Sequence, residues 1–535
     1  MGISIRVRQS FALPFMVVCL FTSEKINGQI AIPVMNNPTE EIFRRKQLLS
    51  DSTVLDLDKL SFMVRPMTVY TIKDSTKSFQ FKVLPLQYIQ QFNSHRPLLY
   101  NDGSMFPARG WQFNYSAGIV AAYKGVTLQV RPEFNWAFNA QFPTFPTDHF
   151  NILWKFQYEW LNKIDMPERF KDEPIRKFFR GQSKLQYAYK GVAVAVSTEN
   201  LWWGPGRYYS LLMSNNAPGF PHLSFHSDKV LKTPIGNFEW QAVAGQLEQS
   251  GTLPLEPLRS FGGSFLYRAK DSSGQRRFIG GVFTYSPKGV KGLFLGADLA
   301  QIQYTSSTPG RARMGSIFAR LSLPDDHAEI YLQYGRSDKF ASPFNLFKNS
   351  IPRGYVAGVR KMFPLRKSPT NIDFIQLGIE VVQLQAPNLK LINNAQSWYT
   401  DSAVRHGFTH EGQVLGASVG PGGNAQRLEV SWVRKEARIG LEFERFLHNP
   451  DFYYRYNYNS GSRDFNRQWV DLMASLVWNF PIKNIQVFGQ FSFVRSINYQ
   501  WKALIPSEID YLNYFDNGWD EINLHGRVGV QVSLN

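Results

Sequence analysis

Apolar and polar side chains alternate along most of the chain after residue 110. From Trp111 to Tyr123 every second residue is aromatic or aliphatic, and after Lys124-Gly125 the pattern restarts at Val126 and runs to Phe134. A period of two predicts β-strands with one apolar face, and the short break predicts a hairpin with a tight turn. The same alternation recurs at 375–381, 427–432, 437–446, 468–478, 485–500 and 522–534.

The predicted strands are long. Many run for about nine to thirteen residues, which suits tilted membrane strands better than the strands of about five or six residues in soluble sheets. We therefore expect an all-β protein: a transmembrane antiparallel β-barrel of about 16 to 18 strands with a small N-terminal plug or periplasmic segment. The alternation predicts that Leu377, Ile379, Val430 and Val530 contact lipid and that Gln376, Glu429 and Gln531 face the lumen.

The amino terminus has the order of a secretory signal peptide. Arg6 and Arg8 precede an apolar run from Phe11 to Phe21, which is too short to span a bilayer as a helix. We expect residues 1–29 to be the signal peptide, 30–105 to form a periplasmic or plug segment that can include the first strand, and 106–535 to form the outer-membrane barrel. Thr39 to Ser50 is polar and is expected to be helical.

Composition narrows the class of partner. The only cysteine, Cys19, lies in the signal peptide, so disulfides and thiolate metal sites are not expected. The formal charge of +17 becomes 17 − 2 = +15 when residues 1–29 are removed. Such a charge suits an acidic polymer or a lipopolysaccharide surface, and export argues against nucleic acid. The aromatic content of 15% is typical of barrels with aromatic girdles.

The most distinctive run extends from Asn200 to Phe220 around a Gly-Pro-Gly turn. Flat aromatic faces beside hydrogen-bond donors are what a sugar ring requires. The same residues could instead pack a loop or girdle, and the sequence leaves both interpretations open. The candidate glycan-binding residues in this run are Trp202, Trp203, Arg207, Asn215 and Asn216.

A second run, Ser397 to His410, contributes the candidates Trp398, Tyr399, Arg405 and His406. His406 and His410 have the spacing of a helical metal pair, but an extended chain separates them by about 13 Å, so no metal site is expected. Gly416-Ala-Ser-Val-Gly420 matches a hydrolase motif in letters only, because Pro421-Gly-Gly423 cannot begin the helix that a nucleophile elbow needs. We expect no catalytic residue and no cofactor.

Four stretches are distinctive: 101–110, 202–206 with 214–220, 352–360, and 397–400 with 406–410 and 420–423. They resemble the Wzi-type capsule-assembly outer-membrane protein family. The resemblance implies a plugged barrel of about 18 strands that holds capsular polysaccharide at the cell surface in a lectin-like manner, and it does not imply an enzyme.

Together these observations predict an outer-membrane barrel that binds surface polysaccharide and helps assemble or retain capsule or exopolysaccharide. The expected partners are an acidic capsular or exopolysaccharide, outer-membrane lipid and lipopolysaccharide, and the barrel-assembly machinery. A porin-type channel for small solutes is the alternative, and an outer-membrane hydrolase is the third candidate.

Overall fold

The computed structural model describes residues 30–32, 38–50, 56–69, 79–98, 100–306, 310–337, 352–365, 373–386, 396–460, 467–503 and 519–534. The predicted signal peptide lies outside these residues. Within them, no helix is both long and apolar enough to cross a membrane.

The described strands form a closed antiparallel barrel of 18 strands, three of which are divided into two shorter segments: β6 with β7, β8 with β9, and β12 with β13. The fold class predicted from the alternation is therefore confirmed. In chain order the barrel contains β4 (Gln80–Asn93), β5 (Gly110–Tyr123), β6 (Val126–Val130), β7 (Glu133–Ala137), β8 (Ile175–Phe179), β9 (Lys184–Tyr189), β10 (Val192–Ser197), β12 (His222–Ser227), β13 (Leu231–Lys232), β14 (Gly236–Leu247), β17 (Arg276–Pro287), β18 (Leu293–Tyr304), β19 (Ala312–Leu323), β20 (Ala328–Ser337), β21 (Arg353–Pro364), β22 (Asp373–Gln383), β25 (Asn424–Arg434), β26 (Ala437–Leu447), β27 (Val470–Ile482), β28 (Ile485–Ile497) and β29 (Glu521–Val532).

The last strand closes the barrel on the first. β29 pairs with β4 from Val532 opposite Leu86 to His525 opposite Asn93, so the first barrel strand lies inside the 30–105 segment. One predicted strand differs from the structure: the run after Lys124-Gly125 breaks at Pro132 into β6 and β7. Proline has no N–H to donate to the ladder, and this accounts for the break.

The predicted facing of the strands is confirmed. Leu377, Ile379 and Val430 are exposed on the outer surface and Val530 is half-buried there, whereas Gln376, Glu429 and Gln531 are buried on the lumen side. Strand neighbours alternate in the same way along β25 to β29. An outward apolar face is what a hydrocarbon environment selects.

This facing predicts how charge is tolerated on β25. Val430→Arg places a cation at mid-depth on the lipid side and is expected to destabilise the barrel by about 2–4 kcal/mol. Gln426→Arg is the matched control, because Gln426 lies on the same face of the same strand near its end and should cost at most about 1 kcal/mol. Urea unfolding in liposomes measures both, and equal losses would place the bilayer elsewhere.

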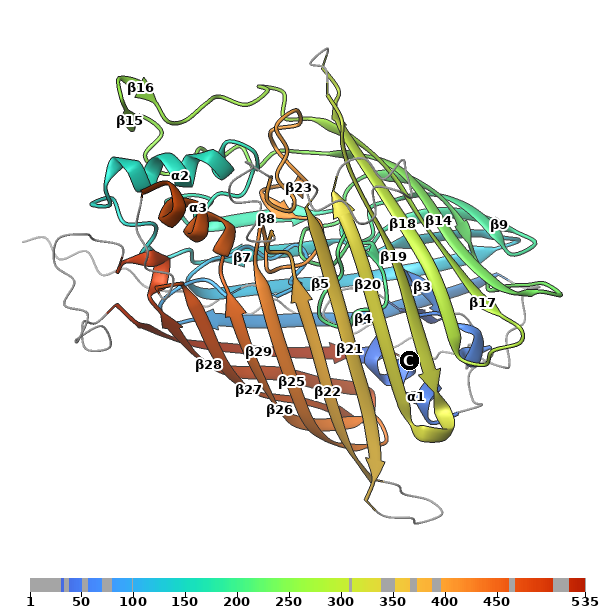
Figure 1. Cartoon of the computed structure of the whole chain (residues 1–535). Helices are drawn as coiled ribbons and strands as arrows, with labels where there is room; N and C mark the ends of the chain where they lie inside the picture. Colours follow the sequence, from blue (N-terminus) through green and yellow to red (C-terminus); the bar gives the residue numbers. More distant parts are fainter. Residues whose placement is uncertain are drawn as a thin grey trace, which may run out of the picture.

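The two ends of the barrel differ. Short turns at 124–125, 190–191, 324–327, 435–436 and 483–484 define the short-turn end, and the segments 138–174, 248–275 and 448–469 define the long-loop end. Outer-membrane barrels place short turns in the periplasm and long loops outside. Figure 1 shows helix α1 (Pro38–Leu48) inside the barrel near the short-turn end, with helices α2 (Asn151–Leu161) and α3 (Pro450–Ser460) at the other.

Short two-stranded sheets accompany the barrel. They pair β1 (Ile30–Ile32) with β3 (Met67–Val69), β2 (Val64–Arg65) with β11 (Trp202–Trp203), β15 (Ser260–Phe261) with β16 (Ser264–Phe265), and β23 (Thr409–His410) with β24 (Gln413–Val414). The β2–β11 sheet joins the amino-terminal segment to residues 202–206, which we call the tryptophan turn.

Glycines in the barrel wall make room for the plug. Gly335 of β20 lies opposite Gly354 of β21, and a Cβ atom at either position would approach Leu211 to 2.8 Å and 3.1 Å respectively. The Trp398 ring would be 3.1 Å from a Cβ at Gly335. A larger residue on this rung would therefore displace Leu211 or Trp398.

Candidate functional site: a lumenal cavity and an outer pocket

The structure brings the two distinctive sequence runs together as the plug. Ser214 N–H donates to the Leu415 carbonyl (2.7 Å), and the Tyr399 hydroxyl donates to the Leu211 carbonyl (2.8 Å). Asn216 Nδ2 donates to the Val414 carbonyl at 3.0 Å. Tyr399 and the segment that follows the second run thus lie beside the first run in the lumen.

The first run is buried. Trp203 is fully buried and its Nε1 donates to Gln241 Oε1 (2.8 Å), while Trp202 lies under the Arg65 guanidinium, 5.0 Å from the ring centroid. Asn215 is also buried, and its Nδ2 donates to a backbone carbonyl. This burial favours the packing interpretation of the turn.

The second run is divided between plug and surface. Trp398 and Tyr399 are 0% and 1% exposed. His406 is buried between the Tyr304 hydroxyl (2.9 Å from Nδ1) and Gln249 Oε1 (3.2 Å from Nε2), and burial together with nearby cations lowers its pKa to about 3. Of the nine candidate residues, Arg405 alone lines a pocket at the long-loop end, within the described part of the chain.

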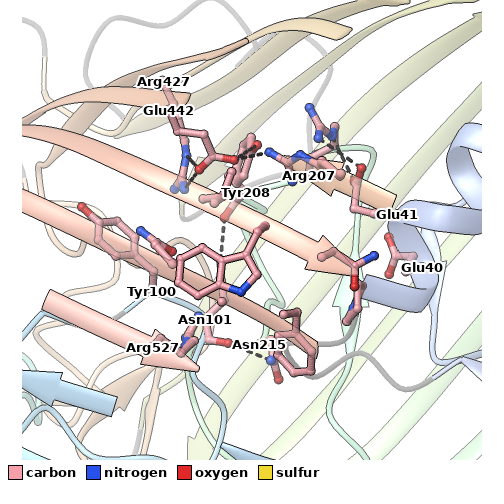
Figure 2. Close-up of a pocket in the computed structure, with 18 of the residues that line it drawn as sticks. Glu40, Glu41, Tyr100, Asn101, Arg207, Tyr208, Asn215, Arg427, Glu442 and Arg527 are labelled. Carbon is pink, nitrogen blue, oxygen red and sulfur yellow. Dashed lines mark hydrogen bonds and ion pairs between the residues drawn. The ribbon is translucent and has the colours of Figure 1, made fainter. Parts of the chain in front are cut away.

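A polar cavity of about 250 Å³ lies in the lumen toward the short-turn end (Figure 2). It is bounded by α1, the tryptophan turn and the wall formed by β25 to β29. Its charged lining residues are Glu40, Glu41, Arg45, Arg65, Arg207, Arg427, Arg438, Glu442 and Arg527.

Most of these charges neutralise one another. Arg207 pairs with Glu41 of α1 (3.0 Å) and with Glu429 of the wall (2.9 Å), and Figure 2 shows Arg207 facing Glu41. Although burial acts to raise the pKa of Glu41, Arg207 and Arg360 hold it well below its usual range.

Four of the five remaining arginines of the cavity follow the same pattern, whereas Arg45 donates to the Glu436 backbone carbonyl. Ion pairs join Arg65 to Glu40, Arg427 to Glu442 and Glu444, Arg438 to Glu429 and Glu442, and Arg527 to Asp102. With this many carboxylates in contact with the arginines, the cavity is a link between plug and wall and offers little unpaired charge to an anionic ligand.

The pocket at the long-loop end differs from the lumenal cavity in that most of its charged side chains are cations. It has a volume of about 460 Å³ and lies between α2, the β15–β16 hairpin and residues 402–405. Figure 1 shows the β15–β16 hairpin beside α2 at this end. The pocket is lined by Lys155, Tyr158, Glu159, Asn162, Lys163, Phe261, Ser264, Phe265, Leu266, Arg268, Ser402 and Arg405.

Four of these side chains are cations and one is a carboxylate, Glu159, which lies 3.6 Å from Arg455. Arg405 is held by three backbone carbonyls, those of Asn162 (3.0 Å), Ala269 (2.8 Å) and Arg268 (2.6 Å), so its charge is fixed in place but not cancelled. Among the described residues, no ion pair joins the four pocket cations to a carboxylate.

Burial and neighbouring cations act on the lysines around the pocket. The pKa of Lys163 is lowered by burial and by Arg455. Lys270, whose Nζ donates to the Ile164 carbonyl, has its pKa lowered by burial to about 8. Burial therefore disfavours the charged form of both lysines at this end of the molecule.

Sequence reasoning missed most of this pocket. The exposed aromatic side chains of Phe261 and Phe265 lie on a hairpin with no long alternating run, and α2 was not predicted. From Trp154 to Trp160, aromatic residues occupy every second position, a period typical of a strand, so this run carried no clear signal for a helix. Only Arg405 connects the predicted set with the pocket.

The serine of the hydrolase-like motif is followed by a turn and a strand and not by a helix. Ser418 is followed by a turn in which Gly420 has a φ of +68°, and its buried Oγ has no hydrogen-bond partner among the described residues. In the same part of the chain, no group of three or more His, Cys, Asp or Glu side chains could hold a metal ion.

Comparison with known proteins gives a family match over part of the chain and solved structures of similar fold. Residues 93–270 match the family model of the capsule assembly protein Wzi. No curated protein sequence matches the chain significantly.

Among solved structures, the chain is similar to Wzi of Escherichia coli, with a TM-score of 0.60 and 11% identity over 95% of this chain and 100% of that one. That protein is described as an outer membrane protein involved in group 1 capsule assembly and as a carbohydrate-binding β-barrel. Acinetobacter baumannii OccAB2 is less similar, with a TM-score of 0.42 and 10% identity over 85% of this chain and 98% of that one. Pseudomonas aeruginosa OccK2 in complex with glucuronate has a TM-score of 0.40 and 11% identity over 85% of this chain and 99% of that one.

The fold is thus that of an outer-membrane barrel, and the match to the family model covers the chain from the end of β4 to the loop before β17. Over residues 93–270, the chain is similar to the family of the capsule assembly protein Wzi.

Proposed function

We propose that this barrel binds surface polysaccharide and helps assemble or retain capsule or exopolysaccharide at the cell surface. The observation that carries the proposal is the outer pocket, where four cations and two exposed aromatic rings lie beside one carboxylate, Glu159, and no ion pair among the described residues neutralises the four cations. Similarity to a family of capsule assembly and to a barrel described as carbohydrate-binding supports the same role. We propose a binding role without a catalysed reaction.

The chemistry of the pocket favours an acidic glycan. Guanidinium and ammonium groups form charge-assisted hydrogen bonds with a uronate carboxylate, and rigid aromatic rings offer flat apolar area at little entropic cost. Arg405 serves as the anchor cation, since backbone carbonyls preorganise it, and Lys155 and Arg268 are exposed at the rim. The tryptophan turn supports the plug and does not touch the glycan. The other proposed partners are lipopolysaccharide and the barrel-assembly machinery.

The double variant Lys155→Gln, Arg268→Gln is expected to lower affinity for polygalacturonate by about tenfold, equivalent to about 1.4 kcal/mol, because two uncancelled charges are removed from the pocket. Added salt should weaken binding of the original protein, since exposed charges are screened beyond about 8 to 10 Å at physiological ionic strength. Binding of refolded full-length protein to the immobilised polymer measures both effects.

The matched control is Lys288→Gln, Lys291→Gln, which removes the same charge from an exposed turn at the short-turn end. Dextran serves as the neutral polymer. Equal losses from the two double variants would show that net charge alone attracts the polymer, and unchanged affinity of a folded pocket variant would refute the site.

A further inference from the structure

The outer surface of four neighbouring strands, β14 and β17 to β19, changes character along its length. Through its middle, the exposed side chains are apolar, among them Ile279, Leu299 and Ile317. At the long-loop end they become polar and basic. The outward side chains there are Gln246, Arg277, Gln301, Gln303, Arg311 and Arg313.

Strand register sets the spacing of this outer basic patch, which we define as Arg277, Arg311 and Arg313. Arg277 lies opposite Gln246 on one side and Gln303 on the other, and Arg313 lies opposite Gln301. Arg277 and Arg313 therefore flank β18, two interstrand spacings apart and two residues apart along it, a separation of about 12 Å between their backbones. Long side chains can converge across that distance on one ligand.

The patch carries uncancelled charge. Arg313 Nε donates to Gln301 Oε1 (2.8 Å), and among the described residues no ion pair joins Arg277, Arg311 or Arg313 to a carboxylate. The same rim shows the contrasting arrangement at Arg495 of β28, which faces outward at the long-loop end and pairs with Asp520 (2.8 Å). An arginine that faces lipid without a counter-ion is energetically unfavourable, and an anionic lipid headgroup could neutralise its charge.

We infer that the outer basic patch binds the phosphate groups of lipopolysaccharide in the outer leaflet, with the acyl chains lying along Ile279, Leu299 and Ile317. The long-loop end faces outward, so the patch is at the depth of the lipid headgroups, directly above the apolar band. Arginine's planar donors suit phosphate, which they can grip in pairs, and the three glutamines offer further hydrogen bonds to a sugar phosphate. This ligand differs from the polysaccharide of the outer pocket and uses other residues.

The test compares lipid binding of the full-length protein, refolded in detergent, by native mass spectrometry with diphosphorylated lipid A. Arg277→Gln, Arg313→Gln is expected to lower affinity at least about tenfold, the equivalent of about 1.4 kcal/mol. Arg445→Gln, Arg495→Gln is the matched control, because both arginines face outward on the same rim away from the patch, and it should change affinity little. Polygalacturonate binding should be the same in both variants.

Two further binding measurements distinguish lipid-bound phosphate from free phosphate. Dephosphorylated lipid A should bind weakly, and inorganic phosphate at equal concentration should not displace lipid A. Equal losses from the two double variants, tight binding of the dephosphorylated lipid, or displacement by phosphate alone would each overturn the inference. If the glutamine variant fails to give the heat-modifiable folded form, Arg277→Lys, Arg313→Lys keeps the charge and should still lose part of the affinity through the lost paired donors.

Discussion

Glu329→Gln is expected to destabilise the barrel by about 3–5 kcal/mol, because it removes one carboxylate that faces three buried guanidinium groups. Glu329 of β20 lies 3.0 Å from Arg44 of α1, 2.7 Å from Arg320 and 2.7 Å from Arg360, and all four side chains are fully buried. Arg360 keeps a second partner in Glu41 (2.8 Å). Arg44 and Arg320 would have no ion-pair partner left among the described residues.

The control for Glu329 is Glu436→Gln. Glu436 also joins α1 to the wall, through Lys46 (3.0 Å), but this pair is partly exposed and should be worth less than about 1 kcal/mol. Urea unfolding followed by tryptophan fluorescence, together with heat-modifiable gel mobility, compares the two. A Glu329→Gln protein as stable as the Glu436→Gln protein would show that the plug does not depend on this buried cluster.

The architecture could be predicted because the strands of a membrane barrel alternate between lipid-facing apolar residues and lumen-facing polar residues, which gives the sequence a period of two. Leu428 and Val430 alternate with Glu429, and the structure places the first two outside and the carboxylate inside. The helix predicted at Thr39 to Ser50 is confirmed as α1, Pro38–Leu48. α2 was missed, because aromatic residues alternate with Lys155, Gln157 and Glu159 from Trp154 to Trp160, and this period of two indicates a strand.

The candidate site was less predictable, for a physical reason. Tryptophan, arginine and asparagine around a glycine turn are suited both to a sugar and to a polar plug inside a barrel. Sequence does not give the burial that separates these cases: Trp203 and Trp398 are both fully buried, whereas Arg405 reaches a pocket. The pocket also combines α2 with residues near 261–268 and 402–405, which only the fold brings together.

Trp203→Ala is expected to cost about 3–5 kcal/mol of stability and to leave polysaccharide affinity unchanged below the unfolding midpoint. The Trp203 ring is fully buried, lies 6.1 Å from the Phe278 ring, and leaves only 3.0 Å for a Cβ at Gly280 of β17. Removing the ring opens a cavity that the rigid barrel wall cannot close, and it leaves the buried Gln241 amide without its 2.8 Å donor.

The pocket variant is the comparison for Trp203→Ala, because it should lose affinity and keep stability. Lys155→Gln, Arg268→Gln changes exposed side chains, so it should lose binding while keeping the unfolding midpoint of the original protein. Measuring stability and polygalacturonate binding on both proteins separates packing from recognition. If Trp203→Ala kept full stability but no longer bound the polymer, the glycan contact would lie at the tryptophan turn, and the plug would have to open to expose it. If both variants behave as expected, the turn holds the plug in the barrel and the pocket at the long-loop end meets the polysaccharide.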